Sequence, residues 1–208
     1  MADMVRHPET YFSGFIPDRD ALLRKLEAEA EKEQIPIIGP VVGELLFVLA
    51  RATGAANILE LGTATGYSAI YLGRACAPAA GRVVSLENDP DMAARAERNL
   101  QEAGLSETVS VRTADALAGL PELNGPFDFV FLDIEKKDYQ PALSALSPIV
   151  RPGGFLIADN TGFRDANAFN RAIFDNPAWR SVQILSFLPM HSARHDGLCF
   201  AVRISDGS

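Results

Sequence analysis

The stretch that decides the fold runs from Ile58 to Ser68 and reads Ile-Leu-Glu-Leu-Gly-Thr-Ala-Thr-Gly-Tyr-Ser. A short apolar strand runs into a glycine loop, and a helix is expected to start at Tyr67. Gly62 and Gly66 let the backbone turn sharply and let a ligand approach closely. Their G-x-x-x-G spacing fits neither the dinucleotide fingerprint G-x-G-x-x-G nor the P-loop, which would need G-K-[ST]. The loop alone is therefore also compatible with a plain tight turn.

Alternating strands and helices extend from this stretch toward the C-terminus. Strands are predicted at 57–61, 82–87, 108–113, 127–133, 154–159, 180–188 and 198–204. Helices are predicted at 67–77, 90–103, 116–120 and 139–150, after two N-terminal helices at 19–34, capped by Asp18, and at 41–52. Residues 1–17 are expected to be irregular. The pattern predicts an α/β fold, a doubly wound and mostly parallel sheet with an antiparallel C-terminal hairpin.

Composition and charge narrow the class of protein. The chain has 208 residues, 48% of them hydrophobic and 22% charged. These values are ordinary for a globular domain and exclude a disordered, collagen-like or coiled-coil chain. The length predicts a single domain, 1–208, in which 1–54 form a helical cap and 55–208 the core.

Partners and compartment follow from the same counts. There are 27 acidic and 19 basic residues, a net charge of −8. This excess disfavours nucleic acid and anionic membranes as partners, and no apolar stretch is long enough to span a bilayer. Cys76 and Cys199 form no disulfide framework, so a cytoplasmic location is expected.

Acidic residues stand at or near the ends of five successive predicted strands: Glu60, Glu87, Asp115, Asp133 and Asp159. In such sheets ligands bind at the carboxyl ends of the strands. Glu87 is placed to accept both hydroxyls of a ribose, as in dinucleotide sites, unless it is a surface acid. Asp115 either meets an adenine amino group or caps the helix that follows it.

Asp133 and Asp159 would meet at the carboxyl edge if their strands are neighbours, with Asn160 beside them. Two carboxylates and an amide oxygen suit Mg²⁺, and also Mn²⁺ or Ca²⁺, better than zinc. The alternative is that both aspartates cap helices or shape turns.

Four segments resemble one family of enzymes. Residues 58–69 resemble motif I of the class I S-adenosylmethionine-dependent methyltransferases. More narrowly they resemble the cation-dependent O-methyltransferases, which include the catechol and caffeoyl-CoA O-methyltransferases and small bacterial relatives. The other similar segments are Pro40-x-x-Gly43-x-Leu45-Leu46, Asp133-x-Glu135-Lys136-x-x-Tyr139 and Asp159-Asn160. The resemblance covers roughly residues 35–204 and implies a seven-stranded Rossmann-like sheet.

The resemblance also implies roles for individual residues. Asp133, Asp159 and Asn160 would bind the cation, and Lys136 would be the general base. The acceptor would be a small catechol-like aromatic molecule, whose two vicinal hydroxyls chelate the ion. A homodimer is compatible with the apolar helix at 41–52, which could equally be buried in the monomer. S-adenosylmethionine would be bound by Glu60, Gly62, Thr63, Ala64, Gly66, Tyr67, Ser68, Glu87, Asn88, Ala114, Asp115 and Asp133.

Two features depart from the family pattern and leave the acceptor open. The loop after Asn160 (161–165) is short, and Pro189 follows Leu188 where catechol methyltransferases carry a carboxylate. His191 and His195 lie in the same loop. They could bind zinc, contact the substrate or be solvated, and the expected hairpin argues against zinc, because i, i+4 spacing suits a metal only on a helix.

Other classes of protein on a similar fold would carry different motifs. A nicotinamide oxidoreductase would need the missing G-x-G-x-x-G loop. A nucleic-acid amine methyltransferase would carry [DNS]-P-P-[YF] at 133–136, where this chain has Asp-Ile-Glu-Lys. A class I methyltransferase with another small-molecule substrate or without a metal, and a non-catalytic nucleotide-binding module, remain alternatives.

Overall fold

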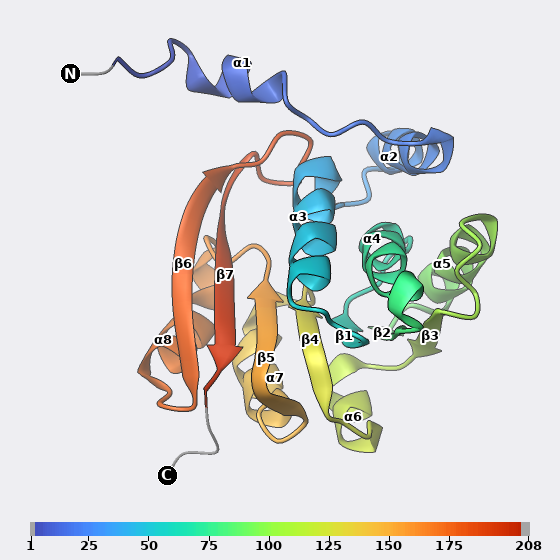
Figure 1. Cartoon of the computed structure of the whole chain (residues 1–208), viewed down its shortest axis with the longest axis vertical. Coiled ribbons are helices and arrows are strands. Elements are labelled where there is room, and N and C mark those ends of the chain that lie inside the picture. The colour runs from blue at the N-terminus through green and yellow to red at the C-terminus, as the bar shows by residue number, and fades with distance from the viewer. Residues whose placement is uncertain (1–2, 205–208) are drawn as a thin grey trace.

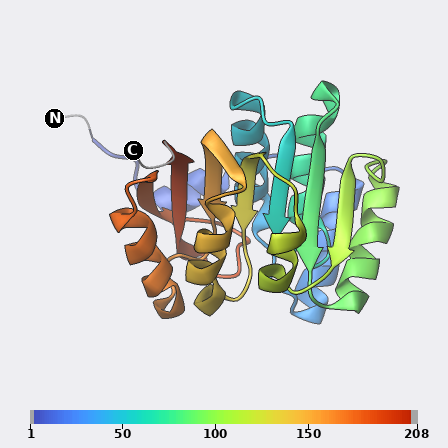
Figure 2. The same ribbon diagram turned by 90° about the horizontal axis from the view of Figure 1, so that it is seen from below.

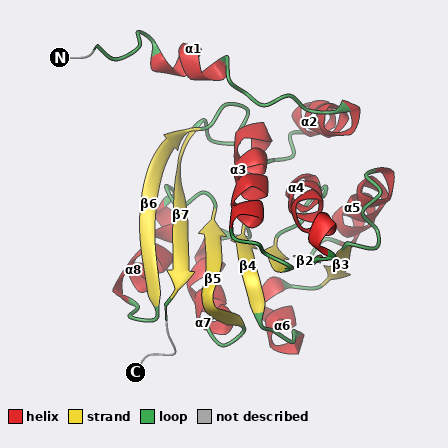
Figure 3. Ribbon diagram, in the orientation of Figure 1, coloured by secondary structure: helices red, strands yellow, loops and turns green. Residues whose placement is uncertain are grey.

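The computed structural model describes residues 3–204 and contains one seven-stranded sheet (Figure 1). Its strand order is β3-β2-β1-β4-β5-β7-β6. All neighbours are parallel except the pairs β5–β7 and β6–β7, which are antiparallel. The strands are β1 (Asn57–Leu61), β2 (Arg82–Glu87), β3 (Val109–Thr113), β4 (Phe127–Leu132), β5 (Val150–Ala158), β6 (Trp179–Phe187) and β7 (His195–Arg203). The predicted fold class, including the C-terminal hairpin, is confirmed (Figure 3).

Helices cover both faces of the sheet (Figure 2). Two buried apolar clusters result, one between the sheet and α2 to α5, the other between the sheet and α6 to α8. The helices are α1 (Pro8–Ser13), α2 (Ala21–Glu33), α3 (Gly39–Ala52), α4 (Tyr67–Cys76), α5 (Pro90–Glu102), α6 (Ala116–Gly119), α7 (Tyr139–Leu146) and α8 (Asn167–Asp175). Within residues 3–204, no helix is long and apolar enough to cross a membrane.

The carboxyl ends of the central strands lie level with one another. Leu132 of β4 pairs with Leu61 of β1 on one side and with Ala158 of β5 on the other. The backbone pairing continues beyond the strands, since the Asp133 N–H donates to the Leu61 carbonyl at 2.9 Å and the Asp159 N–H donates to the Leu132 carbonyl at 3.1 Å. The strand order reverses between β1 and β4, and this edge is where doubly wound sheets bind ligands.

Several predicted boundaries were wrong, each for a local reason. The segment expected to be irregular contains α1, which starts at Pro8, a residue well suited to a first helical turn. The helix predicted at 139–150 ends at Leu146, because Val150 already pairs with Phe127 as the first residue of β5. β7 begins at His195 rather than at 198, so the connection from β6 is shorter than expected.

The N-terminal cap of α2 is Asp20, not Asp18. The Asp20 carboxylate accepts a hydrogen bond from the Leu23 N–H at 2.9 Å and forms an ion pair with Arg74 at 2.6 Å. Asp18 is almost fully exposed and contacts the exposed Arg24. Asp20 therefore starts the helix and ties it to α4.

Replacing Asp20 with Ala is expected to lower the free energy of unfolding by about 1 kcal/mol, the usual loss for an N-cap side chain. Asp18→Ala serves as the matched control and should change it by less than about 0.5 kcal/mol, since exposed ion pairs contribute little. Urea unfolding measures both. Equal losses in the two variants would contradict this cap.

Candidate functional site

The loop from β1 to α4 makes a close turn that needs its glycines. Gly62 has φ +96°, and a Cβ there would overlap the carbonyl oxygen of Asp133. Gly66 has φ +85° and precedes the first residue of α4. Both backbone conformations are strained for residues with a side chain. The loop therefore lies directly against the end of β4.

Glu87 holds this loop from the end of β2. Its Oε2 accepts hydrogen bonds from the Thr63 N–H at 3.1 Å and from the Ala64 N–H at 2.7 Å, and its Oε1 accepts one from the Asp89 N–H at 3.0 Å. A carboxylate offers about four acceptor sites, two on each oxygen, so Oε1 can accept one further hydrogen bond. Glu87 thus shapes the loop and still has acceptor capacity for a ligand.

A cavity of about 580 Å³ opens between the loop and the strand ends. Most of the residues predicted to bind a cofactor, a cation or the proton line it: Gly62, Thr63, Ala64, Tyr67, Ser68, Glu87, Asn88, Ala114, Asp115, Asp133, Lys136, Asp159 and Asn160. Glu60 and Gly66, which were also predicted, are not part of this lining. Asp115 lines the cavity and also caps α6, accepting the Ala118 N–H at 3.0 Å.

Glu60 lies beneath the loop instead of facing the cavity. It is fully buried, and its Oε2 accepts a hydrogen bond from Ser85, which in turn contacts Thr63. Burial raises the pKa of Glu60 to about 7. A strand-end position in the sequence does not reveal whether the side chain points to the ligand face or into the sheet packing.

Asp133 and Asp159 lie at the ends of adjacent strands, and one oxygen of Asp159 has no partner in the described protein. Asp133 Oδ1 is 3.2 Å from Lys136 Nζ, while Asp159 Oδ1 is buried without a partner in the described structure. Burial, and next the charge of Asp159, raise the pKa of Asp133 to about 6. Asp159 is fully buried and Asp133 half-buried, and a bound cation relieves the repulsion between two such neighbouring carboxylates.

Asn160 completes this group of oxygen atoms. It adopts φ +49°, and its Nδ2 donates to Asp196 Oδ2 at 2.7 Å, so the amide oxygen is the end left for a ligand. Across residues 3–204, no set of three or more His, Cys, Asp or Glu side chains is arranged to hold a metal ion. A cation here would need the two carboxylates, the Asn160 oxygen and ligands from outside the chain.

The two histidines predicted to share one loop have different surroundings, since His191 lies in the β6–β7 loop and His195 is the first residue of β7. His191, one of whose predicted environments was solvent, is buried, and its Nε2 lies 2.8 Å from Asp159 Oδ2. His195 is exposed and its Nε2 lies 3.0 Å from Glu9. Their ring nitrogens face different carboxylates, which gives no support to a shared zinc site.

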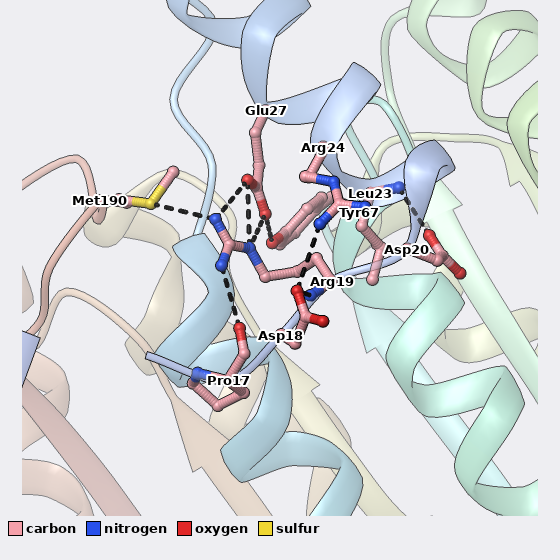
Figure 4. A network of polar contacts seen from close by, with 9 residues as sticks. All are labelled: Pro17, Asp18, Arg19, Asp20, Leu23, Arg24, Glu27, Tyr67 and Met190. Carbon is pink, nitrogen blue, oxygen red and sulfur yellow. Dashed lines mark hydrogen bonds and ion pairs between the residues drawn. The ribbon is translucent and has the colours of Figure 1, made fainter. Parts of the chain in front are cut away.

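Glu27 of α2 forms a buried network that sequence reasoning missed (Figure 4). It accepts hydrogen bonds from Arg19 Nε at 3.0 Å and from the Tyr67 hydroxyl at 2.6 Å. Arg19 also reaches Met190 Sδ at 3.7 Å. Burial and Glu27 raise the pKa of Tyr67 well above its usual range. The other acids of α2, Glu29, Glu31 and Glu33, are partly or fully exposed, so Glu27 is the buried exception.

The N-terminal segment contributes to the lining as well, through Pro36, Ile37 and Ile38, the residues just before α3. In the sequence they fall between the two predicted N-terminal helices, 19–34 and 41–52, and no role is predicted for them. The other lining residues not predicted are Thr65, Leu86, Ala116, Leu117, Ile134, Glu135, Asp138, Phe163, Asp165 and Ser192. These residues come from loops, a strand and short helices and share no residue type, so no periodic pattern in the sequence marks them as lining.

Comparison with known proteins finds O-methyltransferases, both by family and by individual relatives. A family described as O-methyltransferase matches residues 17–177. A catechol O-methyltransferase of Niastella koreensis is 42% identical over 146 residues, which cover 68% of this chain and 66% of the relative. One of Mycobacterium tuberculosis is 38% identical over 151 residues, covering 71% and 68%. The aligned part thus spans about two thirds of the length of each relative.

Solved structures cover nearly the whole chain. The O-methyltransferase TomG of Streptomyces achromogenes, involved in tomaymycin synthesis and solved with SAM, has a TM-score of 0.84, 29% identity and coverage of 95% of this chain and 96% of its own. An O-methyltransferase of Bacillus cereus in complex with SAH has a TM-score of 0.83, 29% identity and coverage of 94% and 96%.

Replacing Glu60 with Gln tests the buried acid below the loop. An acid whose pKa is higher in the folded than in the unfolded chain stabilises the fold at low pH, and this contribution is lost as the pH rises toward 7. With a pKa of about 7 against a usual 4.5, the wild type should lose about 2 to 3 kcal/mol relative to Glu60→Gln between pH 5 and pH 8. Denaturant unfolding at both pH values measures the difference, and parallel changes in the two proteins would contradict it.

Proposed function

The chain belongs to the O-methyltransferase family, and from this we propose that it transfers the methyl group of S-adenosylmethionine to a hydroxyl of a small catechol-like aromatic molecule, assisted by a divalent cation. One observation carries the proposal. Asp159, whose Oδ1 is buried without a partner, and Asp133, whose pKa is raised, lie together at the carboxyl ends of β5 and β4, beside the glycine loop and its cavity.

The glycine loop is the proposed cofactor site. S-adenosylmethionine would lie over Gly62 to Ser68, with its ribose near Glu87 and its adenine near Ala114 and Asp115. The similar Streptomyces and Bacillus proteins were solved with SAM and SAH, which supports this choice of cofactor. Glu60 and Gly66 would act from behind the loop, by packing rather than by contact.

Asp133, Asp159 and Asn160 are the proposed cation ligands. Carboxylate and amide oxygens favour Mg²⁺, with Mn²⁺ or Ca²⁺ as substitutes. A bound cation would lower the pKa of a coordinated hydroxyl and orient it. The catechol O-methyltransferase names of the relatives support a substrate with two vicinal hydroxyls, which together fit such an ion.

Lys136 is the proposed general base. Its Nζ lies 3.2 Å from Asp133 Oδ1 and 5.8 Å from the centre of the Tyr139 ring, so it is held over the strand ends. In the transfer, a bond forms between the acceptor oxygen and the methyl carbon while the bond from that carbon to sulfur breaks. The hydroxyl proton would pass to the neutral amine form of Lys136, which becomes the ammonium that pairs with Asp133, and S-adenosylhomocysteine is left.

We further propose that the chain works as one methyltransferase domain, with residues 1–54 as a cap on the core. The support is that Pro36, Ile37 and Ile38 line the cavity beside residues of the core. Cys76 and Cys199 are both buried free thiols, which supports a reducing compartment such as the cytoplasm.

Methyl transfer to a panel of phenols tests the proposed reaction. With Mg²⁺, methylation is expected for vicinal diphenols and not for monophenols or meta-diphenols, because only the vicinal pair can chelate. Addition of EDTA should lower the rate by at least about 100-fold, and Mg²⁺ should restore it. A rate unchanged by EDTA would contradict the cation mechanism.

Variants in the same assay separate the roles. Asp159→Asn should behave like EDTA treatment, and Lys136→Gln should lower kcat about 100-fold or more, the usual range for a general base. The exposed neighbour Lys137 provides the matched control, and Lys137→Gln should leave kcat unchanged.

A homodimer built on α1 is also proposed. No residue of α1 is buried, and the rings of Tyr11, Phe12 and Phe15 form an exposed cluster with centroids 5.0 to 6.4 Å apart, on a segment that extends beyond the rest of the molecule (Figure 1). Such apolar patches are typical of association sites. Light scattering should give twice the chain mass, and the triple change to Ser should give a monomer. A monomeric wild type would contradict the proposal.

A further inference from the structure

The β6–β7 loop places an imidazole against one of the proposed cation ligands. His191 Nε2 lies 2.8 Å from Asp159 Oδ2, with the His191 side chain 0% exposed and that of Asp159 1% exposed. The other ring nitrogen, Nδ1, lies 3.2 Å from the Ala193 nitrogen and 3.0 Å from the Ala193 oxygen. Both nitrogens of the ring therefore have polar neighbours, and neither reaches solvent.

Hydrogen-bond chemistry decides which atom donates. An ionised carboxylate only accepts, so Nε2 must carry a hydrogen in order to bond to Asp159. Nδ1 then accepts from the Ala193 N–H in the neutral ring, or donates to the Ala193 carbonyl in the charged ring. In both states one Asp159 oxygen receives a hydrogen bond and the other, Oδ1, stays without a partner.

The loop that carries His191 is itself fixed in place. The Leu188 N–H donates to the Arg194 carbonyl at 2.7 Å, and the His191 N–H donates to the Leu188 carbonyl at 3.2 Å. At the start of α3, Gly39 lies so close to this loop that a Cβ would come within 2.8 Å of the Met190 carbonyl oxygen. Arg19 reaches the Met190 sulfur from the α2 side (Figure 4). The imidazole therefore has a defined orientation.

We propose that His191 is a positioning residue, which binds one oxygen of Asp159 and so presents the other to the cation. The inference rests on the proposed function, because it takes Asp159 as a ligand. Groups that bind metals are commonly oriented by hydrogen bonds from neighbouring side chains. Asn160 is held in the same manner by Asp196 of β7. The C-terminal hairpin would thus orient two of the three proposed ligands.

His191→Gln and His191→Asn both introduce a side-chain amide, but the Gln side chain is one carbon longer. The amide of Gln can occupy the place of Nε2 and donate to Asp159, whereas the amide of Asn reaches only the place of Nδ1. Mn²⁺ binding, followed by electron paramagnetic resonance without an acceptor, is the readout. His191→Gln should bind Mn²⁺ within about threefold of the wild type, and His191→Asn about 10 to 100 times more weakly.

Controls show that the effect is local. His195→Asn changes an exposed histidine at the end of the same loop and should bind Mn²⁺ like the wild type. The affinity for S-adenosylhomocysteine and the thermal midpoint report on the fold, and the Asn and Gln variants should agree in both.

The possible outcomes distinguish a failure of the proposed role of His191 from a failure of the proposed cation site. Weaker Mn²⁺ binding in His191→Asn with recovery in His191→Gln would support the inference. Equal binding by both variants and the wild type would overturn it and leave the proposed cation site standing. A wild type that does not bind Mn²⁺ would overturn the cation site and this inference together.

Discussion

The contact between the backbones of Gly62 and Asp133 is the constraint on which the site depends. It exists because residue 62 has no side chain, since a Cβ would overlap the Asp133 carbonyl. β1 and β4 are neighbours at the point where the strand order reverses, and their ends are joined by the bond from Asp133 N–H to Leu61. The glycine loop and the first carboxylate are therefore held at a fixed separation by the sheet itself.

This arrangement carries a cost in stability. Asp133 lies partly buried beside the fully buried Asp159, and its partial burial, followed by the charge of Asp159, raises the pKa of Asp133 to about 6. A buried polar atom without a partner, such as Asp159 Oδ1, costs about 1–3 kcal/mol. Lys136 and His191 offset the charge only in part, since each contacts one oxygen of one carboxylate. A site of this kind is prepared for a positive ligand, and such costs are common at functional sites.

The sequence predicted the sheet well because its signals are local. Apolar runs, turn residues and an acid at or near the ends of five strands indicated which edge of the sheet would face a ligand, and β1 and β2 have the predicted bounds. It could not predict contacts made by chain segments far apart. Glu27 looked like a solvated helix residue, yet it is buried by Arg19 and by Tyr67, 40 residues away.

His191 shows the same limit within the site. Its loop has no periodic pattern, so solvent, substrate and metal were all reasonable interpretations of its surroundings. Only the return of β7 beside β5 brings the loop over the Asp159 end of the sheet. Side-chain direction was a second limit, since Glu60 stands at a strand end like the other acids and points into the packing.

A crystal structure of the protein soaked with Mn²⁺ and S-adenosylhomocysteine would show whether the three oxygen-bearing side chains hold a cation beside the cofactor. We expect an anomalous-scattering peak at coordination distance from Asp133, Asp159 and the amide oxygen of Asn160, next to the cofactor over the glycine loop. A cofactor in place with no manganese peak at these three residues would contradict it.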